Sequence, residues 1–168
     1  DTRRTRKLLT HFGIETPLRS LHAHSGPRAV ASVIGVLLAG HDVAVVSDAG
    51  MPGVSDPGAE LVAAAGANNI PVNVVPGPSA LTAAVAISGF SAEALVFLGF
   101  PPQRALQRRR LFQRIGPWGC GVVLFESPVR IRECLADLLT CLGDRRVVVC
   151  RELTKVHESV TRGLLSDV

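Results

Sequence analysis

Short apolar runs alternate along the chain with longer stretches in which apolar positions recur at helical spacing. Short continuous apolar runs between glycine or proline residues are typical of strands buried on both faces of a parallel sheet. The pattern predicts such strands at residues 43–46, 72–75, 95–98, 122–125 and 147–150. Strands that alternate with helices indicate an α/β fold built from βα units.

The intervening stretches predict helices, and several of their starts carry capping residues. One helix follows Asp56 and Pro57, which suit the N-cap and the first helical position. Another begins at Ser127-Pro128 and ends near residue 142. Further helices are expected at residues 79–88 and 107–115.

The composition changes near residues 88–94, from Ala, Gly and Val before this point to Arg and Cys after it. We therefore expect two α/β lobes, an N-terminal lobe at residues 1–90 and a C-terminal lobe at residues 91–168. The linker between them is short, and a ligand held between two such lobes is geometrically natural.

Overall composition favours a folded protein without a membrane span. Hydrophobic residues make up 47% of the 168 residues and charged residues 19%, which argues against intrinsic disorder. No apolar run approaches the roughly 18 residues that a membrane span needs. The four cysteines lack CxxC spacing, so we expect no metal site, and reduced thiols in the cytoplasm.

The charge pattern suggests an anionic partner. Net charge is +4, and sixteen of the eighteen basic residues are Arg. Five of them crowd the helix expected at 107–115 and its approach, with no acidic residue among them: Arg104, Arg108, Arg109, Arg110 and Arg114. Such a cluster has no ion pairs along its own helix to offset repulsion. RNA is one interpretation, and a solvated helical face is the other.

Two loops at the expected carboxyl edge of the sheet are candidates for a ligand site. The loop SDAGMPGVSDPG, residues 47–58, follows the strand expected at 43–46, where open α/β sheets bind ligands. Its glycines permit close approach of a ligand, and Asp48 could accept hydrogen bonds from ribose hydroxyls or an amino group. An Asx-turn is the alternative for Asp48. In the loop PGPSA, residues 76–80, Ser79 could serve an anion or cap the following helix.

Five stretches, in this order and spacing, resemble the ribosomal RNA small-subunit methyltransferase I family of the tetrapyrrole-methylase-like superfamily: DTRRTRKLL, SDAGMPGVSDPG, VVPGPSA, FESPVRI and RELTKVHESVTRG. The resemblance implies the two-lobed fold of class III S-adenosylmethionine methyltransferases. It also implies a first strand and loop before residue 1, a last helix and strand after residue 168, and a homodimer. The implied reaction is 2′-O-methylation of a cytidine in 16S ribosomal RNA of the small subunit, with S-adenosylmethionine as cofactor.

The resemblance also implies which residues bind the cofactor and the RNA. The cofactor residues would be Asp48, Ala49, Gly50, Pro52, Pro76, Gly77, Ser79, Ala80 and Phe125. Asp1 and Arg3 match a motif that lies near the same cleft. The RNA-binding candidates are Arg3, Arg104, Arg108, Arg109 and Arg110.

Ribose hydroxyls are weak nucleophiles, so a nearby cation or a carboxylate base would assist the transfer. Arg151 or Lys155 is the candidate cation, and Glu126 or Glu152 is the candidate base; spacing does not decide among them.

Two other functions fit the same pattern. A tetrapyrrole methylase acting on a corrin precursor would share the fold and the cofactor. A non-catalytic RNA-binding descendant of the enzyme would keep the basic residues without the chemistry.

Overall fold

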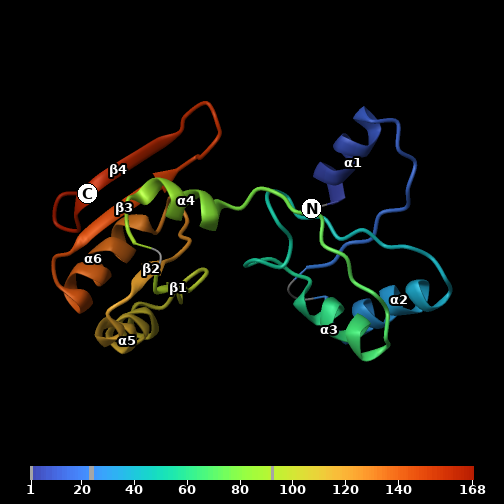
Figure 1. Ribbon diagram of the computed structural model, residues 1–168, viewed down its shortest axis with the longest axis horizontal. Helices are drawn as coiled ribbons and strands as arrows, with labels where there is room; N and C mark the ends of the chain where they lie inside the picture. Colours follow the sequence, from blue (N-terminus) through green and yellow to red (C-terminus); the bar gives the residue numbers. More distant parts are fainter. Residues whose placement is uncertain (1, 23–24, 92) are drawn as a thin grey trace. The chain divides into compact units, whose positions relative to one another are not determined.

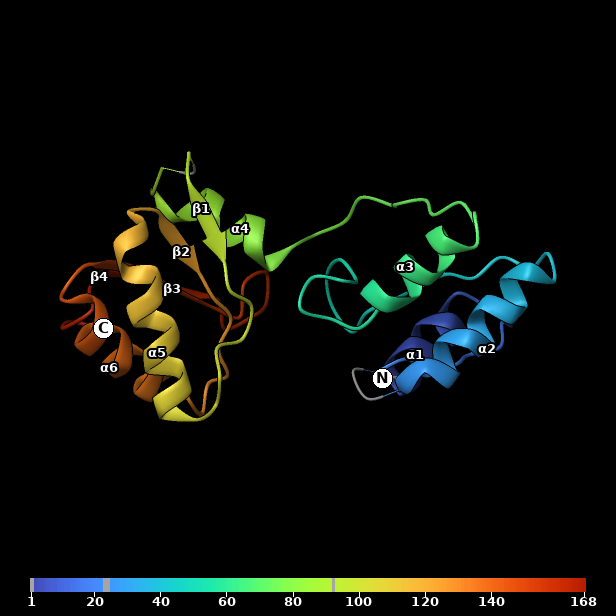
Figure 2. The same cartoon turned by 90° about the horizontal axis from the view of Figure 1, so that it is seen from below.

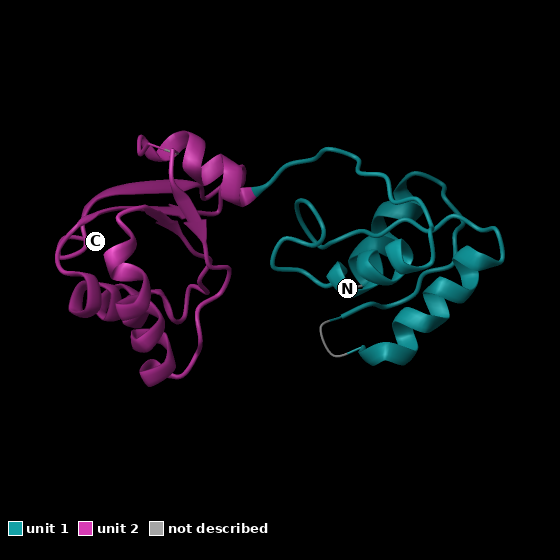
Figure 3. Cartoon of the chain, turned by 60° about the horizontal axis from the view of Figure 1, so that its bottom comes forward, with its two compact units in different colours: residues 1–79 teal, residues 80–168 magenta. Residues whose placement is uncertain are grey.

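The computed structural model describes residues 2–22, 25–91 and 93–168. The chain forms two units, Asp1–Ser79 and Ala80–Val168 (Figures 1 and 3). Helix α4 (Ala80–Ser88), which the sequence assigned to the first lobe, belongs to the second unit. The lobe division at residue 90 stays a prediction.

The first unit is built around two packed helices. It contains α1 (Thr2–His11), α2 (Gly26–Leu38) and α3 (Ala59–Ala67), and α2 and α3 lie side by side (Figure 2). Their buried residues form one small apolar core: Val33, Ile34, Leu61 and Ala65. Alanine-rich α3 presents little side-chain bulk, which permits close packing against the branched side chains of α2.

The prediction of strands at residues 43–46 and 72–75 is wrong. Neither segment forms a strand, and the described part of the first unit contains none. Val46 is 59% exposed and Val75 is 84% exposed. An apolar run becomes a strand only when a neighbour completes its hydrogen-bond ladder, and neither segment is part of one in the described chain.

Both predicted helix caps are also wrong. Helix α3 begins at Ala59 with Gly58 as its N-cap, whose φ of 139° favours glycine over the expected Asp56. Helix α6 (Ile131–Leu142) begins after a turn, in which the Ser127 carbonyl accepts hydrogen bonds from the Arg130 and Ile131 amides. Arg130 holds the N-cap position and makes no side-chain capping bond.

The second unit confirms the α/β pattern. Strands β1 (Leu95–Phe97) and β2 (Gly121–Val123) pair in parallel, with Leu95 opposite Gly121. The connection between them runs through α5 (Ala105–Ile115) and a short 3₁₀ turn, η1 (Gly116–Trp118). A parallel pair joined through a helix is the βαβ unit that the sequence predicts. Strand β2 is shorter than expected, although the Phe125 amide still donates to the Gly99 carbonyl (2.8 Å).

A second, separate sheet completes this unit. Strand β3 (Arg146–Arg151) pairs antiparallel with β4 (Ser159–Leu164), so that Arg151 lies opposite Ser159. The sequence pattern predicts β3 but not β4, and it predicts parallel pairing. The polar stretch between the two strands is a hairpin connection, which allows antiparallel pairing without a helical crossover.

Helices α5 and α6 pack against each other and enclose the core of the second unit (Figure 2). The buried residues are Phe112, Ile115, Cys134, Leu138 and Leu165. Burial raises the pKa of the Cys134 thiol to about 11, so this cysteine behaves as a small apolar residue. All four cysteines are free thiols.

A buried ion pair joins the same two helices. Arg108 of α5 is 1% exposed, and its Nε and Nη2 atoms lie 2.7 and 2.6 Å from Asp137 Oδ2 of α6. Nη1 of Arg108 donates to the Gln103 carbonyl (3.2 Å). Burial alone would raise the pKa of Asp137, but the hydrogen bonds from Arg109 and Arg108 outweigh it and hold this pKa below its ordinary value of 3.8.

The burial of Arg108 corrects one sequence-based expectation. A side chain enclosed between two helices cannot contact an RNA phosphate, so the structure removes Arg108 from the RNA-binding candidates. Within the described ranges, no helix is long and apolar enough to cross a membrane.

We expect Arg108→Ala to lower the free energy of unfolding by about 3 to 5 kcal/mol, because it removes one partner of a buried charge pair. Arg110→Ala, on the exposed side of the same helix, should change it by no more than about 0.5 kcal/mol. Urea denaturation of the two variants checks this. Equal losses in both would contradict a structural role for the buried pair.

Candidate functional site

The two glycine- and proline-rich loops of the first unit touch each other. The Met51 amide donates to the Pro78 carbonyl (3.0 Å). Gly50 has a φ of +72°, and a Cβ atom at this position would lie 3.1 Å from the Pro78 oxygen. Both the backbone conformation and the close approach therefore favour glycine at residue 50.

Further contacts give the first loop a defined shape. The Ser47 hydroxyl lies 3.0 Å from the Ala49 carbonyl oxygen and 2.8 Å from that of Gly50. The Met51 sulfur would lie 3.3 Å from a Cβ atom on Gly77, so the two loops also approach closely there. The structure thus brings the predicted cofactor residues 48–52 next to residues 76–78.

The chemistry of these loops fits a ligand with hydroxyl and amino groups. Asp48 and the backbone of residues 76–78 are exposed, and a carboxylate accepts hydrogen bonds from such groups. Gly50 and Gly77 let the two loops pack closely beside Asp48, because a Cβ at either position would crowd the opposite loop. Ala80 and Phe125 belong to the second unit, so their share in a cofactor site stays a prediction.

Phe125 forms an aromatic cluster just beyond the parallel strand pair. Its ring centroid lies 4.9 Å from that of Phe97 and 5.6 Å from that of Phe100, both in edge-on arrangements. Phe125 is a candidate from the sequence, whereas its two partners are not; Phe97 is the last residue of β1, and Phe100 follows that strand. The cluster provides an apolar wall at the carboxyl end of β1 and β2.

Glu126 is engaged in a local ion pair. Its side chain is 1% exposed, and Oε1 accepts from the Ser127 amide (2.7 Å) and from Nε (2.9 Å) and Nη2 (2.8 Å) of Arg130. These bonds engage one of the two carboxylate oxygens, and the almost complete burial of the side chain restricts access of a substrate proton to the other. The geometry therefore favours a structural role for Glu126 in the turn before α6. Its catalytic role stays a prediction.

The β3–β4 connection brings two other catalytic candidates together. Lys155 Nζ lies 3.1 Å from Glu152 Oε1, and the Lys155 side chain is 63% exposed. Glu152 and Thr154 adopt positive φ values of 51° and 67°, and the Thr154 amide donates to Glu158 Oε2 (2.5 Å). Arg151 is exposed at the end of β3. Strained backbone in an ordered loop is a frequent feature of functional sites.

The remaining RNA-binding candidates lie on exposed helical surface. Arg104 and Arg110 are exposed on or beside α5, and Arg3 is exposed on α1; Asp1 lies outside the described residues. Arg109 is half-exposed and bonded to Asp137. In the part of the chain that the structure describes, no group of three His, Cys, Asp or Glu side chains could hold a metal ion.

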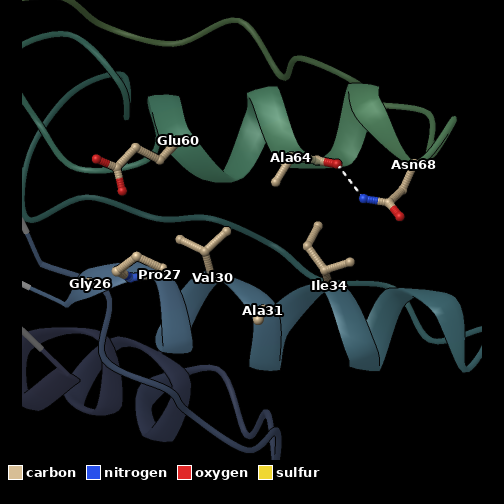
Figure 4. A pocket seen from close by; sticks show the side chains of 8 residues that line it. All are labelled: Gly26, Pro27, Val30, Ala31, Ile34, Glu60, Ala64 and Asn68. Atoms are coloured by element: carbon tan, nitrogen blue, oxygen red, sulfur yellow. Dashed lines mark hydrogen bonds between the residues drawn. The ribbon is translucent and has the colours of Figure 1, made fainter.

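An apolar groove lies between α2 and α3 (Figure 4), and the sequence does not predict it because no polar motif marks it. It has a volume of about 700 Å³. Glu60 and Asn68 lie toward its two ends, and Asn68 Nδ2 donates to the Ala64 carbonyl (2.8 Å). Its lining is Gly26, Pro27, Val30, Ala31, Ile34, Glu60, Ala64 and Asn68.

Comparison with known proteins gives one family and a consistent set of relatives. The model of the tetrapyrrole (corrin/porphyrin) methylases matches residues 1–168. Proteins named ribosomal RNA small subunit methyltransferase I are 44% identical in Thermotoga maritima, 47% in Xylella fastidiosa and 43% in Halalkalibacterium halodurans. The alignments cover 99%, 100% and 99% of this chain. The chain spans 75%, 62% and 58% of those relatives, respectively.

Gly50→Ala should open the contact between the two loops, because the new Cβ would crowd the Pro78 oxygen and also strain the backbone. We expect the Met51 amide to exchange with solvent at least about tenfold faster than in Gly53→Ala, a loss of roughly 1.4 kcal/mol of protection.

Gly53→Ala is the matched control, since Gly53 has a similar φ of +82° but nothing within 4 Å of a Cβ. Amide hydrogen exchange measured by NMR distinguishes the two variants. The same exchange rate in both would show that the Pro78 contact does not hold the loop.

Proposed function

The chain belongs to the tetrapyrrole methylase family, and we propose that the protein methylates the ribose 2′-hydroxyl of a cytidine in 16S ribosomal RNA of the small subunit. The relatives named above carry the proposal, since their identity to this chain of 43% to 47% extends over nearly all of it. S-Adenosylmethionine, the proposed cofactor, supplies an electrophilic methyl group that already carries its leaving group.

The loops of the first unit are the proposed cofactor site. Asp48 would accept hydrogen bonds from hydroxyl or amino groups, and Gly50 and Gly77 would let the two loops pack together next to it. The support is the observed contact between the loops through Met51 and Pro78. We include Ala49, Pro52, Pro76 and Ser79 in the same proposed site, and the roles of Ala80 and Phe125 in cofactor binding rest on the family resemblance.

The hairpin connection of the second unit is the proposed source of the catalytic groups. Lys155 would stabilise negative charge that develops on the attacking oxygen, and Glu152 would accept its proton. Their ion pair of 3.1 Å supports a shared site for the two roles. Arg151 is the alternative cation and Glu126 the less supported alternative base.

The proposed partners follow from the same function. Exposed arginines on α1, on α5 and at the N-cap of α5 would contact RNA phosphates: Arg3, Arg104, Arg109 and Arg110. We further propose a homodimer in the cytoplasm, where ribosomal subunits are found.

Methyl transfer can be tested directly by incubating the intact protein with methyl-labelled S-adenosylmethionine and small ribosomal subunits that lack the modification. We expect one 2′-O-methylcytidine, located by nuclease digestion and mass spectrometry. Bound cofactor without label in RNA would favour a tetrapyrrole substrate instead. Subunit binding without cofactor binding would favour a non-catalytic RNA-binding protein.

Lys155→Ala should reduce the methyl-transfer rate at saturating substrate at least about tenfold, the equivalent of roughly 1.4 kcal/mol of transition-state stabilisation. Val156→Ala is the control, because Val156 is the next residue in the loop and is 94% exposed. Single-turnover kinetics measure both. A rate for Lys155→Ala within about twofold of wild type would remove Lys155 from the catalytic proposal.

A further inference from the structure

Arg109 differs from the other exposed arginines of α5 in being fixed at one edge. Its Nε lies 2.6 Å from Asp137 Oδ1, whereas its side chain is 53% exposed. The other carboxylate oxygen, Oδ2, binds buried Arg108. One carboxylate on α6 therefore neutralises a buried arginine and at the same time holds a surface arginine in place.

The free edge of Arg109 has the chemistry of a phosphate-binding fork. A guanidinium presents donors on Nε, Nη1 and Nη2 in one plane, and Asp137 engages the Nε of Arg109. The two terminal nitrogens remain for a second acceptor, and paired N–H donors of this kind match the spacing of phosphate oxygens. Arg108, Arg109 and Asp137 together carry a net charge of +1, and Glu133, whose Oε2 lies 3.7 Å from Arg108 Nη2, reduces the sum to zero. The attraction for an anion therefore comes from the two remaining terminal nitrogens of Arg109 and from Arg110, the next residue on the exposed side of α5.

The bond to Asp137 distinguishes Arg109 from the neighbouring arginines of α5. Arg110 and Arg114 are exposed on the same helix, and neither has a described hydrogen-bond or ion-pair partner among residues 2–22, 25–91 and 93–168. Flexible side chains lose rotamer freedom when they bind, whereas a fixed side chain has lost it already. A fixed guanidinium is also directional, which an unrestrained charge is not.

We propose that Asp137 is a positioning residue for RNA binding, which holds the Arg109 guanidinium as a preformed fork for one backbone phosphate of the small-subunit RNA. The inference rests on the proposed function and adds a specific contact to it. Arg108 secures Asp137 from the buried side, and Arg110 supplies non-directional charge next to the fork.

Substitution of Arg109 by lysine tests whether subunit binding depends on the shape of the guanidinium or only on its charge. Arg109→Lys keeps the positive charge but cannot bind Asp137 through Nε and a phosphate through two further nitrogens. We expect it to weaken binding of unmodified small subunits about tenfold, as for a lost hydrogen bond to a charged group. Arg114→Lys, the matched control, should stay within about twofold of wild type. The dependence of affinity on salt should be unchanged in both, because no charge is lost.

A double-mutant cycle tests the role of Asp137 itself. Asp137→Asn should weaken subunit binding in the wild-type background and have little effect in an Arg109→Ala background, because the residue acts through Arg109. Weakening by the same factor in both backgrounds would indicate a merely structural role and overturn the proposal. If Asp137→Asn does not fold, the two lysine variants decide by themselves.

The methyl-labelling reaction separates this inference from the proposed function. Wild-type protein that labels RNA, together with equal subunit affinities for Arg109→Lys and Arg114→Lys, would overturn the fork and leave the function standing. Failure of wild-type protein to label or bind the subunit would overturn both.

Discussion

The ion pair between Arg108 and Asp137 is the interaction on which the second unit most depends. Both side chains are almost fully buried, and each would be costly to bury without the other. Their pairing determines how α5 lies against α6, and the apolar core forms beside it through Phe112 and Cys134. Helix α5 also forms part of the connection between β1 and β2.

The first unit depends on a different constraint, the absence of side chains where its two loops meet. Gly50 faces the Pro78 carbonyl and Gly77 faces Met51, so either position would be crowded by a Cβ atom. Pro76 and Pro78 flank Gly77, and Pro52 follows two residues after Gly50, which limits the conformations available to the loops. A site formed in this way presents backbone and the Asp48 carboxylate to a ligand, which suits recognition of a polar cofactor more than proton transfer.

Cofactor binding and catalysis are thus proposed for two different kinds of structure. The proposed cofactor site uses rigid glycine-proline loops, and the proposed catalytic pair uses a hairpin connection with positive φ values at Glu152 and Thr154. The proposed RNA contacts lie on helices, where Asp137 links the packing of the core to the order of a surface arginine. Membership of the tetrapyrrole methylase family is consistent with this division, since one fold can serve several substrates when different loops carry the specificity.

The sequence by itself determined the family, the helices at α4 and α5, the strands β1 and β3, and the loops that carry the candidate site. These features depend on local periodicity and on glycine and proline, which act within a few residues. Tertiary structure decided whether the apolar runs at 43–46 and 72–75 became strands, because a ladder needs a partner from elsewhere in the chain. It also decided that Arg108 is buried while Arg110 is exposed. The neutralising carboxylate lies on another helix, at Asp137, and charge patterns along a single helix cannot show it.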